Sequence, residues 1–211
     1  CEVYNCTAPG TGGGLTLLSG PSGIDNHLVK DNLIRNNRAD HYGGALFTKM
    51  PVIFEGNAVE TNHSRWQYGG VSFVETVKCS VLRNRFSGNY SEDYNSAARN
   101  PGGLFIKSSA VTNVKNNIFY NNTGYVAGAA QFITCTPTVV NVINNTFADN
   151  NTLAAGGATV RTETDTDFVN NIFEGDLAGI RIVGTPAPVV NITCNNFHDH
   201  SDRITINPNH S

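Results

Sequence analysis

Charged residues are scarce in this chain, and they form no basic run. They make up 15% of the 211 residues, and the formal net charge is −3. Proteins that bind nucleic acid usually carry a clustered basic patch, so the composition argues against a nucleic-acid partner. Apolar residues do not form an uninterrupted stretch of about 18, the length that would indicate a membrane-spanning helix. We therefore expect no membrane span in this segment.

Cysteine is also sparse, and no Cys-x-x-Cys pair occurs, which argues against a zinc ribbon or a redox dithiol. The five cysteines are Cys1, Cys6, Cys79, Cys135 and Cys194. Cys1 and Cys6 are close enough in sequence to suggest a local disulfide that pins residues 1–11. The other three are interpreted as small apolar fillers. We expect no metal and no cofactor, and the abrupt start at Cys1 suggests a mature or excised segment.

The residues that are abundant are those of turns and short strands. The chain has 28 Asn and 21 Gly but a single Met, a composition that disfavours helices. Seven times an aromatic or aliphatic residue is followed three positions later by Asn or a substitute, and we call each such four-residue segment a mark. The marks are Ile34–Asn37, Phe54–Asn57, Phe86–Asn89, Phe119–Asn122, Phe147–Asn150, Phe173–Asp176 and Phe197–His200. Their spacings of 20, 32, 33, 28, 26 and 24 residues indicate one solenoid turn per repeat.

A strand with one buried face follows each glycine pair. The pairs are Gly13-Gly14, Gly43-Gly44, Gly69-Gly70, Gly102-Gly103 and Gly156-Gly157, with Gly128-Ala129 as a variant. The aligned segments are Leu15–Leu17, Ala45–Phe47, Val71–Phe73, Leu104–Ile106, Ala130–Phe132, Ala158–Val160 and Ile180–Ile182. Their first and third residues are apolar, a period of two that predicts a half-buried strand. Equivalent residues are expected to stack in a parallel ladder about 4.8 Å apart. The glycine pairs would form a corner with positive φ.

Asparagine recurs at two positions of each repeat, where its amide must be satisfied. One column is predicted two residues before each mark, at Asn32, Asn84, Asn117, Asn145, Asn171 and Asn195, with Val52 as a break. The other is predicted at Asn37, Asn57, Asn89, Asn122 and Asn150, continued by Asp176 and His200. Stacked amides can bond to one another and to the bent backbone.

These patterns predict an all-β fold, a single right-handed parallel β-helix over residues 1–211. It would have about seven rungs of two or three strands, with repeats from about residue 12 to 206, Asn ladders and a stacked Phe core. A left-handed helix would instead show strict six-residue periods.

The motifs of this chain resemble the repeats of chlamydial polymorphic outer membrane proteins. The similarity rests on Gly43-Gly44-Ala45-Leu46 with Phe54–Asn57, and on Gly156-Gly157-Ala158 with Phe147–Asn150. It extends over about residues 12–200, although Gly128-Ala129 and Ala178-Gly179 depart from the tetrapeptide. The resemblance implies an extracellular passenger domain that adheres to cells or other surfaces. The wider β-helix group also contains pectate lyases, polygalacturonases and epimerases, so an enzyme remains an alternative.

Two long loops on neighbouring rungs are the predicted binding face, because insertions in solenoids often gather there. They are Ala58–Tyr68 and Tyr90–Pro101. The candidate binding residues are His41, Tyr42, Arg65, Trp66, Tyr68, Tyr90, Tyr94 and Tyr125, beside Glu60, Glu92, Asp93 and Arg99. Exposed aromatic rings beside charges suit sugar stacking or a protein hot spot. The alternative is that the loops fold onto themselves, with Trp66 capping its own insertion.

An enzyme would need paired carboxylates or a cation beside an acidic cluster. The best candidates, Glu163, Asp165 and Asp167, alternate and could line one side of a strand. A solvated turn or a weak calcium site explains them equally well. A second polar cluster comprises His198, Asp199, His200, Asp202 and Arg203, in which His200 is interpreted as a ladder residue.

Eight Asn-x-Ser/Thr sequons occur, at Asn5, Asn62, Asn89, Asn121, Asn144, Asn150, Asn191 and Asn209. The predicted register buries Asn89 and Asn150 and leaves Asn62 in a loop. If the protein comes from a eukaryote, Asn62 is therefore the predicted glycan acceptor.

We expect an extracellular or cell-surface adhesion module that binds a glycan or a surface protein without catalysis. One alternative is an end-to-end filament of copies, because open β-helix ends carry unpaired backbone groups. The other is a polysaccharide lyase or hydrolase.

Overall fold

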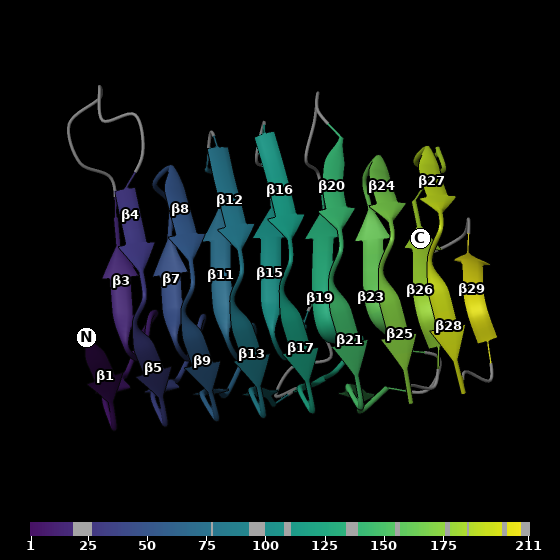
Figure 1. Ribbon diagram of the computed structural model, residues 1–211. Coiled ribbons are helices and arrows are strands. Elements are labelled where there is room, and N and C mark those ends of the chain that lie inside the picture. Colours follow the sequence, from purple (N-terminus) through teal and green to yellow (C-terminus); the bar gives the residue numbers. More distant parts are fainter. Residues whose placement is uncertain are drawn as a thin grey trace.

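The computed structural model describes residues 1–18, 27–76, 78–92, 100–107, 111–133, 139–154, 157–175, 178–184, 186–199 and 202–207. Four parallel sheets of eight, seven, eight and six strands run along the molecule. Figure 1 labels the strands of the eight- and seven-stranded sheets, which stack in chain order from the N-terminal to the C-terminal end. The predicted all-β parallel β-helix is confirmed, although each turn has four strands rather than two or three.

The four sheets are numbered here in the order in which the chain visits them after a glycine pair. Sheet 1 contains β3 (Leu15–Leu17), β7 (Leu46–Thr48), β11 (Val71–Val74), β15 (Leu104–Lys107), β19 (Ala127–Ile133), β23 (Ala158–Glu163), β26 (Ala178–Val183) and β29 (Asp202–Asn207). Sheet 2 contains β4 (His27–Lys30), β8 (Val52–Glu55), β12 (Lys78–Leu82), β16 (Val111–Lys115), β20 (Val140–Ile143), β24 (Thr166–Val169) and β27 (Val190–Thr193).

Sheets 3 and 4 complete each turn. Sheet 3 contains β1 (Glu2–Tyr4), β5 (Leu33–Arg35), β9 (Ala58–Glu60), β13 (Arg85–Ser87), β17 (Ile118–Tyr120), β21 (Thr146–Ala148), β25 (Ile172–Glu174) and β28 (Asn196–His198). Sheet 4 consists of the two-residue strands β2 (Thr7–Ala8), β6 (Arg38–Ala39), β10 (His63–Ser64), β14 (Tyr90–Ser91), β18 (Thr123–Gly124) and β22 (Asn151–Thr152).

A column of stacked rings forms the centre of the core on sheet 3. Phe119 lies between Phe86 and Phe147, with centroid distances of 4.7 and 5.0 Å and nearly parallel planes. Phe173 and Phe197 continue the column, each 4.8 Å from the preceding ring. The predicted stacked Phe core is confirmed, since identical side chains recur one turn apart at equivalent places.

The predicted register was wrong in one turn, at the mark Phe54–Asn57. Phe54 pairs with Val81 in sheet 2, whereas Val59 pairs with both Ile34 and Phe86 in sheet 3. The reason is that an apolar residue followed three positions later by Asn occurs twice per turn, five residues apart. In this turn the first unit carries Phe and the second carries Val, so the aromatic ring marked the wrong unit.

Two Asn ladders run through the interior, as predicted, and the corrected register removes the break at Val52. In the first, each Asn bonds to the next along Asn32, Asn57, Asn84, Asn117, Asn145, Asn171 and Asn195. The second runs along Asn37, Asn62, Asn89, Asn122 and Asn150. Asn57 therefore belongs to the first ladder and Asn62 takes its place in the second. The predicted continuations Asp176 and His200 lie outside the described residues.

Each ladder Asn follows a residue in the left-handed backbone region. The first corner contains Asp31, Gly56, Arg83, Asn116, Asn144, Asn170 and Cys194. The second contains Asn5, Asn36, Thr61, Gly88, Asn121, Asp149, Gly175 and Asp199. Asn, Asp and Gly tolerate positive φ better than other residues. Each turn thus repeats one unit twice: apolar residue, spacer, left-handed corner, ladder Asn.

The glycine pairs are needed for close approach more than for positive φ. Of the pair glycines described, only Gly43 has positive φ, at 65°. A Cβ added at Gly44 would lie 2.2 Å from the Gly69 carbonyl oxygen, and one at Gly70 equally close to that of Gly103. Any larger residue would therefore push neighbouring turns apart.

The alignment of the strands after the glycine pairs was wrong in two turns. Leu46 and Val160, not Ala45 and Ala158, stand in register with the first apolar position. Thr48 and Thr162 consequently occupy the third, core-facing position and are buried. In the core, the Thr162 hydroxyl forms a hydrogen bond with that of Thr166 at 2.7 Å. This bond satisfies a polar side chain at a position where the predicted alternation had an apolar residue.

The suggested disulfide between Cys1 and Cys6 is not formed, and both thiols are exposed. Strand β1 lies between them and holds their Cα atoms about 10 Å or more apart, beyond the reach of about 7 Å that a disulfide allows. Cys79 is a buried core residue, as expected, whereas Cys194 is exposed at a corner. Cys135 lies outside the described residues.

Candidate functional site

The edge next to sheet 4 gathers most of the predicted binding residues. Parallel pairing continues past the short strands, with Arg65 N–H donating to the Ala39 carbonyl and Gln67 N–H to that of His41. This register places Trp66 over His41, and their rings stack at 4.4 Å with planes 18° apart. We call the surface formed by His41, Tyr42, Arg65 and Trp66 the aromatic edge.

Tyr68 belongs to the scaffold beneath the aromatic edge. Its ring lies 3.7 Å from that of Phe105 and is nearly parallel to it. Leu104 and Ile106 belong to the main core, so the intervening Phe105 faces the outer side of sheet 1. Tyr68 covers this ring and retains 7% of its accessible surface. It therefore serves to fix the edge.

Trp66 is the large ring that the aromatic edge presents to solvent. It is 36% exposed, with one face of the indole against His41. Tyr42, stacked 5.6 Å from Tyr68, is half-buried behind it. The edge thus combines an outward ring with a rigid aromatic base, which keeps the entropy cost of binding low.

A polar column on sheet 4 adjoins the aromatic edge. The register stacks Arg38, His63 and Tyr90 on successive turns. His63 Nε2 lies 3.0 Å from Glu92 Oε1, and the imidazole is 5.4 Å from the Tyr90 ring. Burial lowers the pKa of His63, and Arg38 adds to this shift while Glu92 opposes it. His63 is therefore neutral at pH 7 and can donate or accept a hydrogen bond.

Sequence reasoning missed His63 because it treated Ala58–Tyr68 as a loop. That segment contains β9 and β10, and its Glu60 lies on sheet 3 in an ion pair with Arg85. Correct alignment of His63-Ser64 with Arg38-Ala39 and Tyr90-Ser91 would have revealed the column.

Of the remaining predicted binding residues, Tyr90 and Tyr125 are described by the structure and Tyr94 is not. Tyr90 is 36% exposed on β14, and Tyr125 is half-buried just after β18, where its N–H donates to the Asn100 carbonyl. The segment Tyr90–Pro101 begins as strand β14 rather than as a loop. Tyr94, Asp93 and Arg99 lie outside the described residues.

The three acids considered for catalysis do not line one side of a strand. Glu163 lies on sheet 1, 3.0 Å from Arg161 Nη2 and 3.2 Å from Gln131 Nε2. The chain then turns, and Asp165 accepts a bond from Val189 N–H at 2.7 Å. Asp167 lies on sheet 2 and accepts a bond from Asn191 at 2.7 Å. The turn between β23 and β24 thus separates Glu163 from Asp165 and Asp167, which both face the segment that carries β27.

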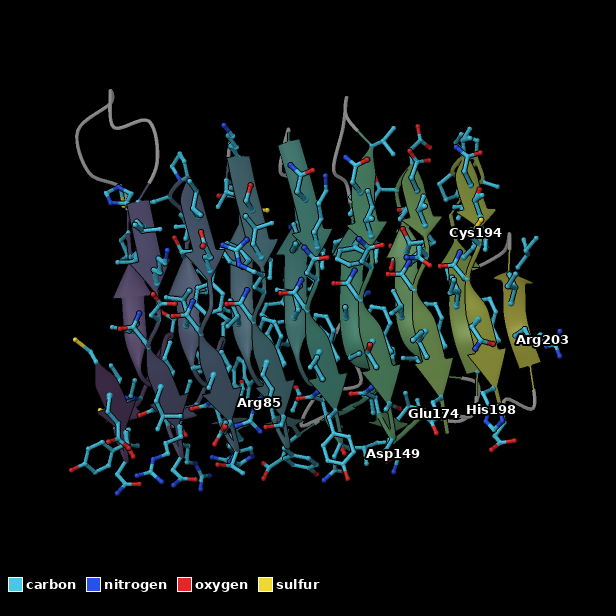
Figure 2. The ribbon with its side chains drawn as sticks, in the orientation of Figure 1. Arg85, Asp149, Glu174, Cys194, His198 and Arg203 are labelled. Atoms are coloured by element: carbon cyan, nitrogen blue, oxygen red, sulfur yellow. The ribbon has the colours of Figure 1, made fainter. Side chains whose placement is uncertain are left out.

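The polar cluster near the C-terminus is also divided between sheets. His198 lies on β28 of sheet 3, with its Nδ1 2.9 Å from Asp199. Asp202 and Arg203 belong to β29 of sheet 1, and His200 is outside the described residues. Figure 2 shows Arg85, Glu174 and His198 along the outer side of sheet 3, with Arg203 apart from them.

The placement of Asn62 in a loop was wrong, so the reason for choosing it as a glycan acceptor no longer holds. Asn62 is fully buried in the second ladder, where its Nδ2 donates to the Ile34 carbonyl and to Asn89 Oδ1. Both amide hydrogens are used, and no space remains for a sugar.

Within the described ranges, no group of three or more His, Cys, Asp or Glu side chains has a geometry that could hold a metal ion. The same part of the chain contains no helix long and apolar enough to cross a bilayer.

The fold defines a β-solenoid whose ladders build a rigid rod and whose edge displays aromatic and charged side chains. The model of the family described as right handed beta helix region matches residues 1–136 of the 211. The match covers more than half of the chain, and the chain belongs to this family. The predicted right-handed helix is thereby confirmed. No curated protein and no solved structure matches the chain significantly.

Proposed function

We propose that this β-helix is an extracellular or cell-surface adhesion module that binds a glycan or a surface protein at its aromatic edge, without catalysis. The observation that carries the proposal is the Trp66–His41 stack, 4.4 Å apart, with the indole 36% exposed. A preordered indole offers a sugar ring or a partner side chain a large apolar face at low entropic cost.

Polar groups beside this ring supply the directional contacts that recognition requires. Arg38 and Tyr90 are exposed on sheet 4, and His63 lies between them in the column. Glu92, whose Oε1 lies 3.0 Å from His63 Nε2, is partly exposed and can accept hydrogen bonds from hydroxyl groups. Hydroxyl-rich sugars and polar protein loops both fit this mixture of ring and polar surface.

The repeat motifs support a surface location. The tetrapeptide Gly43-Gly44-Ala45-Leu46 and the recurring Phe-x-x-Asn units resemble chlamydial polymorphic outer membrane proteins, whose repeats are exposed passenger domains. On this proposal the ladders provide a stable rod and the edge provides the contact.

The alternatives have less support. Glu163, Asp165 and Asp167 each bond to a different neighbour, which favours structural roles over a polysaccharide lyase or hydrolase. For an end-to-end filament, no described contact plays the part that the Trp66–His41 stack plays for binding.

The test is retention of the protein on arrayed oligosaccharides and on intact cultured cells. We expect Trp66→Ala to weaken retention at least about tenfold, the effect of losing roughly 1.4 kcal/mol at a central aromatic contact. Tyr120→Ala is the matched control, because Tyr120 is 49% exposed on sheet 3 away from the aromatic edge. Equal losses in both variants, or wild-type protein that binds neither surface, would contradict the proposal.

A further inference from the structure

The corrected register sorts the eight sequons into distinct structural classes. Asn5, Asn121 and Asn144 occupy left-handed corners and are exposed. Asn62, Asn89 and Asn150 occupy the second ladder and are buried. Asn191 lies on the outer face of sheet 2 with its Nδ2 bonded to Asp167, and Asn209 is outside the described residues.

The two classes arise from one structural unit, in which a corner residue is followed immediately by a ladder residue. The corner has φ of 55° at Asn5, 52° at Asn121 and 55° at Asn144. The left-handed turn directs this side chain to solvent and the next one inward. An Asn-Asn-Thr sequence therefore has an exposed acceptor when its first Asn is the corner, as at Asn121 and Asn144.

The corner amides have room for an attached sugar. Asn144 Oδ1 accepts a bond from Asn170 Nδ2 at 2.8 Å, which leaves Asn144 Nδ2 directed away from that contact. The hydroxyl residues of the two Asn-Asn-Thr sequons that begin at a corner, Thr123 and Thr146, are half-buried rather than enclosed. A glycan at either corner would project from the rod and disturb neither ladder.

The ladder amides have no such room. Asn89 Nδ2 donates to the Val59 carbonyl at 2.9 Å and to Asn122 Oδ1 at 2.9 Å. Asn150 Nδ2 donates to the carbonyls of Phe119 and Ala148, both at 3.0 Å. A glycan replaces one amide hydrogen and adds a bulky group, so a chain modified at these residues cannot close the ladder.

We propose that Asn5, Asn121 and Asn144 are attachment sites for N-linked oligosaccharides, and that the ladder sequons must stay unmodified for the chain to fold. In the transfer, Nδ2 forms a bond to C1 of a lipid-diphosphate-linked oligosaccharide. The C1–O bond breaks, the lipid diphosphate leaves, and the amide loses one proton. The inference rests on the extracellular route of the proposed function, but it does not depend on what the aromatic edge binds.

The experiment is secretion of the full chain from a eukaryotic host, followed by glycopeptide mapping of the folded, protease-resistant fraction. We expect glycans at Asn5, Asn121 and Asn144 and unmodified amides at Asn62, Asn89 and Asn150. Thr123→Val with Thr146→Val should remove two glycans from the intact mass. Folded protein with a glycan on any ladder residue, or with all three corners bare, would overturn the proposal.

If little folded protein is secreted, a second variant tests the claim that the ladder sequons must stay unmodified for the chain to fold. Ser64→Ala, Ser91→Ala and Thr152→Val abolish the three ladder sequons and keep every ladder Asn. We expect this triple variant to raise the folded yield relative to wild type in the glycosylating host. Expression in bacteria without N-glycosylation measures the intrinsic cost of the substitutions, including the loss of the Ser64 hydroxyl, whose one hydrogen faces the carbonyls of His41 and Gln67. An unchanged yield in both hosts would refute the claim that ladder glycans block folding. Because the readouts are mass and yield, a failure here is distinct from a failure of ligand binding.

Discussion

Replacing Phe119 by alanine lowers the free energy of unfolding by about 3–5 kcal/mol, the cost of truncating a fully buried aromatic residue. The ring is completely buried and stacks on Phe86 and Phe147, so its removal opens a cavity between two turns. Each lost aromatic pair adds about 0.5–1.5 kcal/mol to the transfer term. Relaxation is limited, because the backbone of each turn is bonded to both neighbours. Urea denaturation followed by circular dichroism measures the loss.

The neighbouring residue in the same strand supplies the control for Phe119. Ile118 points to the opposite side of sheet 3 and is 47% exposed. Ile118→Ala should cost less than about 1 kcal/mol, because little apolar area returns to water. Similar losses for the two variants would mean that the faces of this strand are wrongly assigned.

Replacing Asn117 by alanine destabilises the protein by about 3 kcal/mol or more, because several buried groups lose their partners at once. Asn117 Oδ1 accepts bonds from the backbone N–H and Nδ2 of Asn84, at 2.8 and 3.1 Å. Its Nδ2 donates to the Val81 carbonyl and to Asn145 Oδ1, both at 2.9 Å. Each buried group left unsatisfied costs about 1–3 kcal/mol. Urea denaturation reports the change, with side-chain amide exchange as a local readout.

The preceding asparagine is the matched control for the ladder. Asn116 is exposed and has φ of 58°, so Asn116→Gly keeps the corner and removes no buried bond. We expect a change within about 0.5 kcal/mol, as for ordinary surface substitutions. If Asn117→Ala were as mild as this control, the ladder would contribute little to stability.

Much of the fold could be predicted because each turn repeats the same residue types at equivalent positions. Glycine pairs, alternating strands and recurring Asn specify the parallel stack, and both ladders were predicted. The error at Phe54 arose because each turn contains two equivalent units, and side-chain type alone does not tell them apart. Thr48 and Thr162 misled the strand alignment, since their hydroxyls are satisfied by bonds that only the folded core reveals.

The candidate site was less predictable than the fold. The sequence alone indicated the aromatic residues His41, Tyr42 and Trp66, and the structure brings them together. The burial of Tyr68 depends on Phe105, which lies on the next turn of sheet 1. This contact could not be predicted as long as Tyr68 was assigned to a loop. The burial of Asn62, which was predicted to lie in a loop, follows from the shift of five residues in the register of its turn.

The central claim is that each turn contains two units and that β9, not β8, lies beside β13. Cross-linking of cysteine pairs tests it most directly, in a chain whose native cysteines are replaced. Ala58 and Arg85 are register partners on sheet 3, whereas Ile53 pairs with Ser80 on sheet 2. A bifunctional thiol reagent that spans one strand spacing, about 4.8 Å, should join Ala58→Cys to Arg85→Cys and leave Ile53→Cys with Arg85→Cys unlinked. Efficient cross-linking of the second pair and not the first would contradict the account.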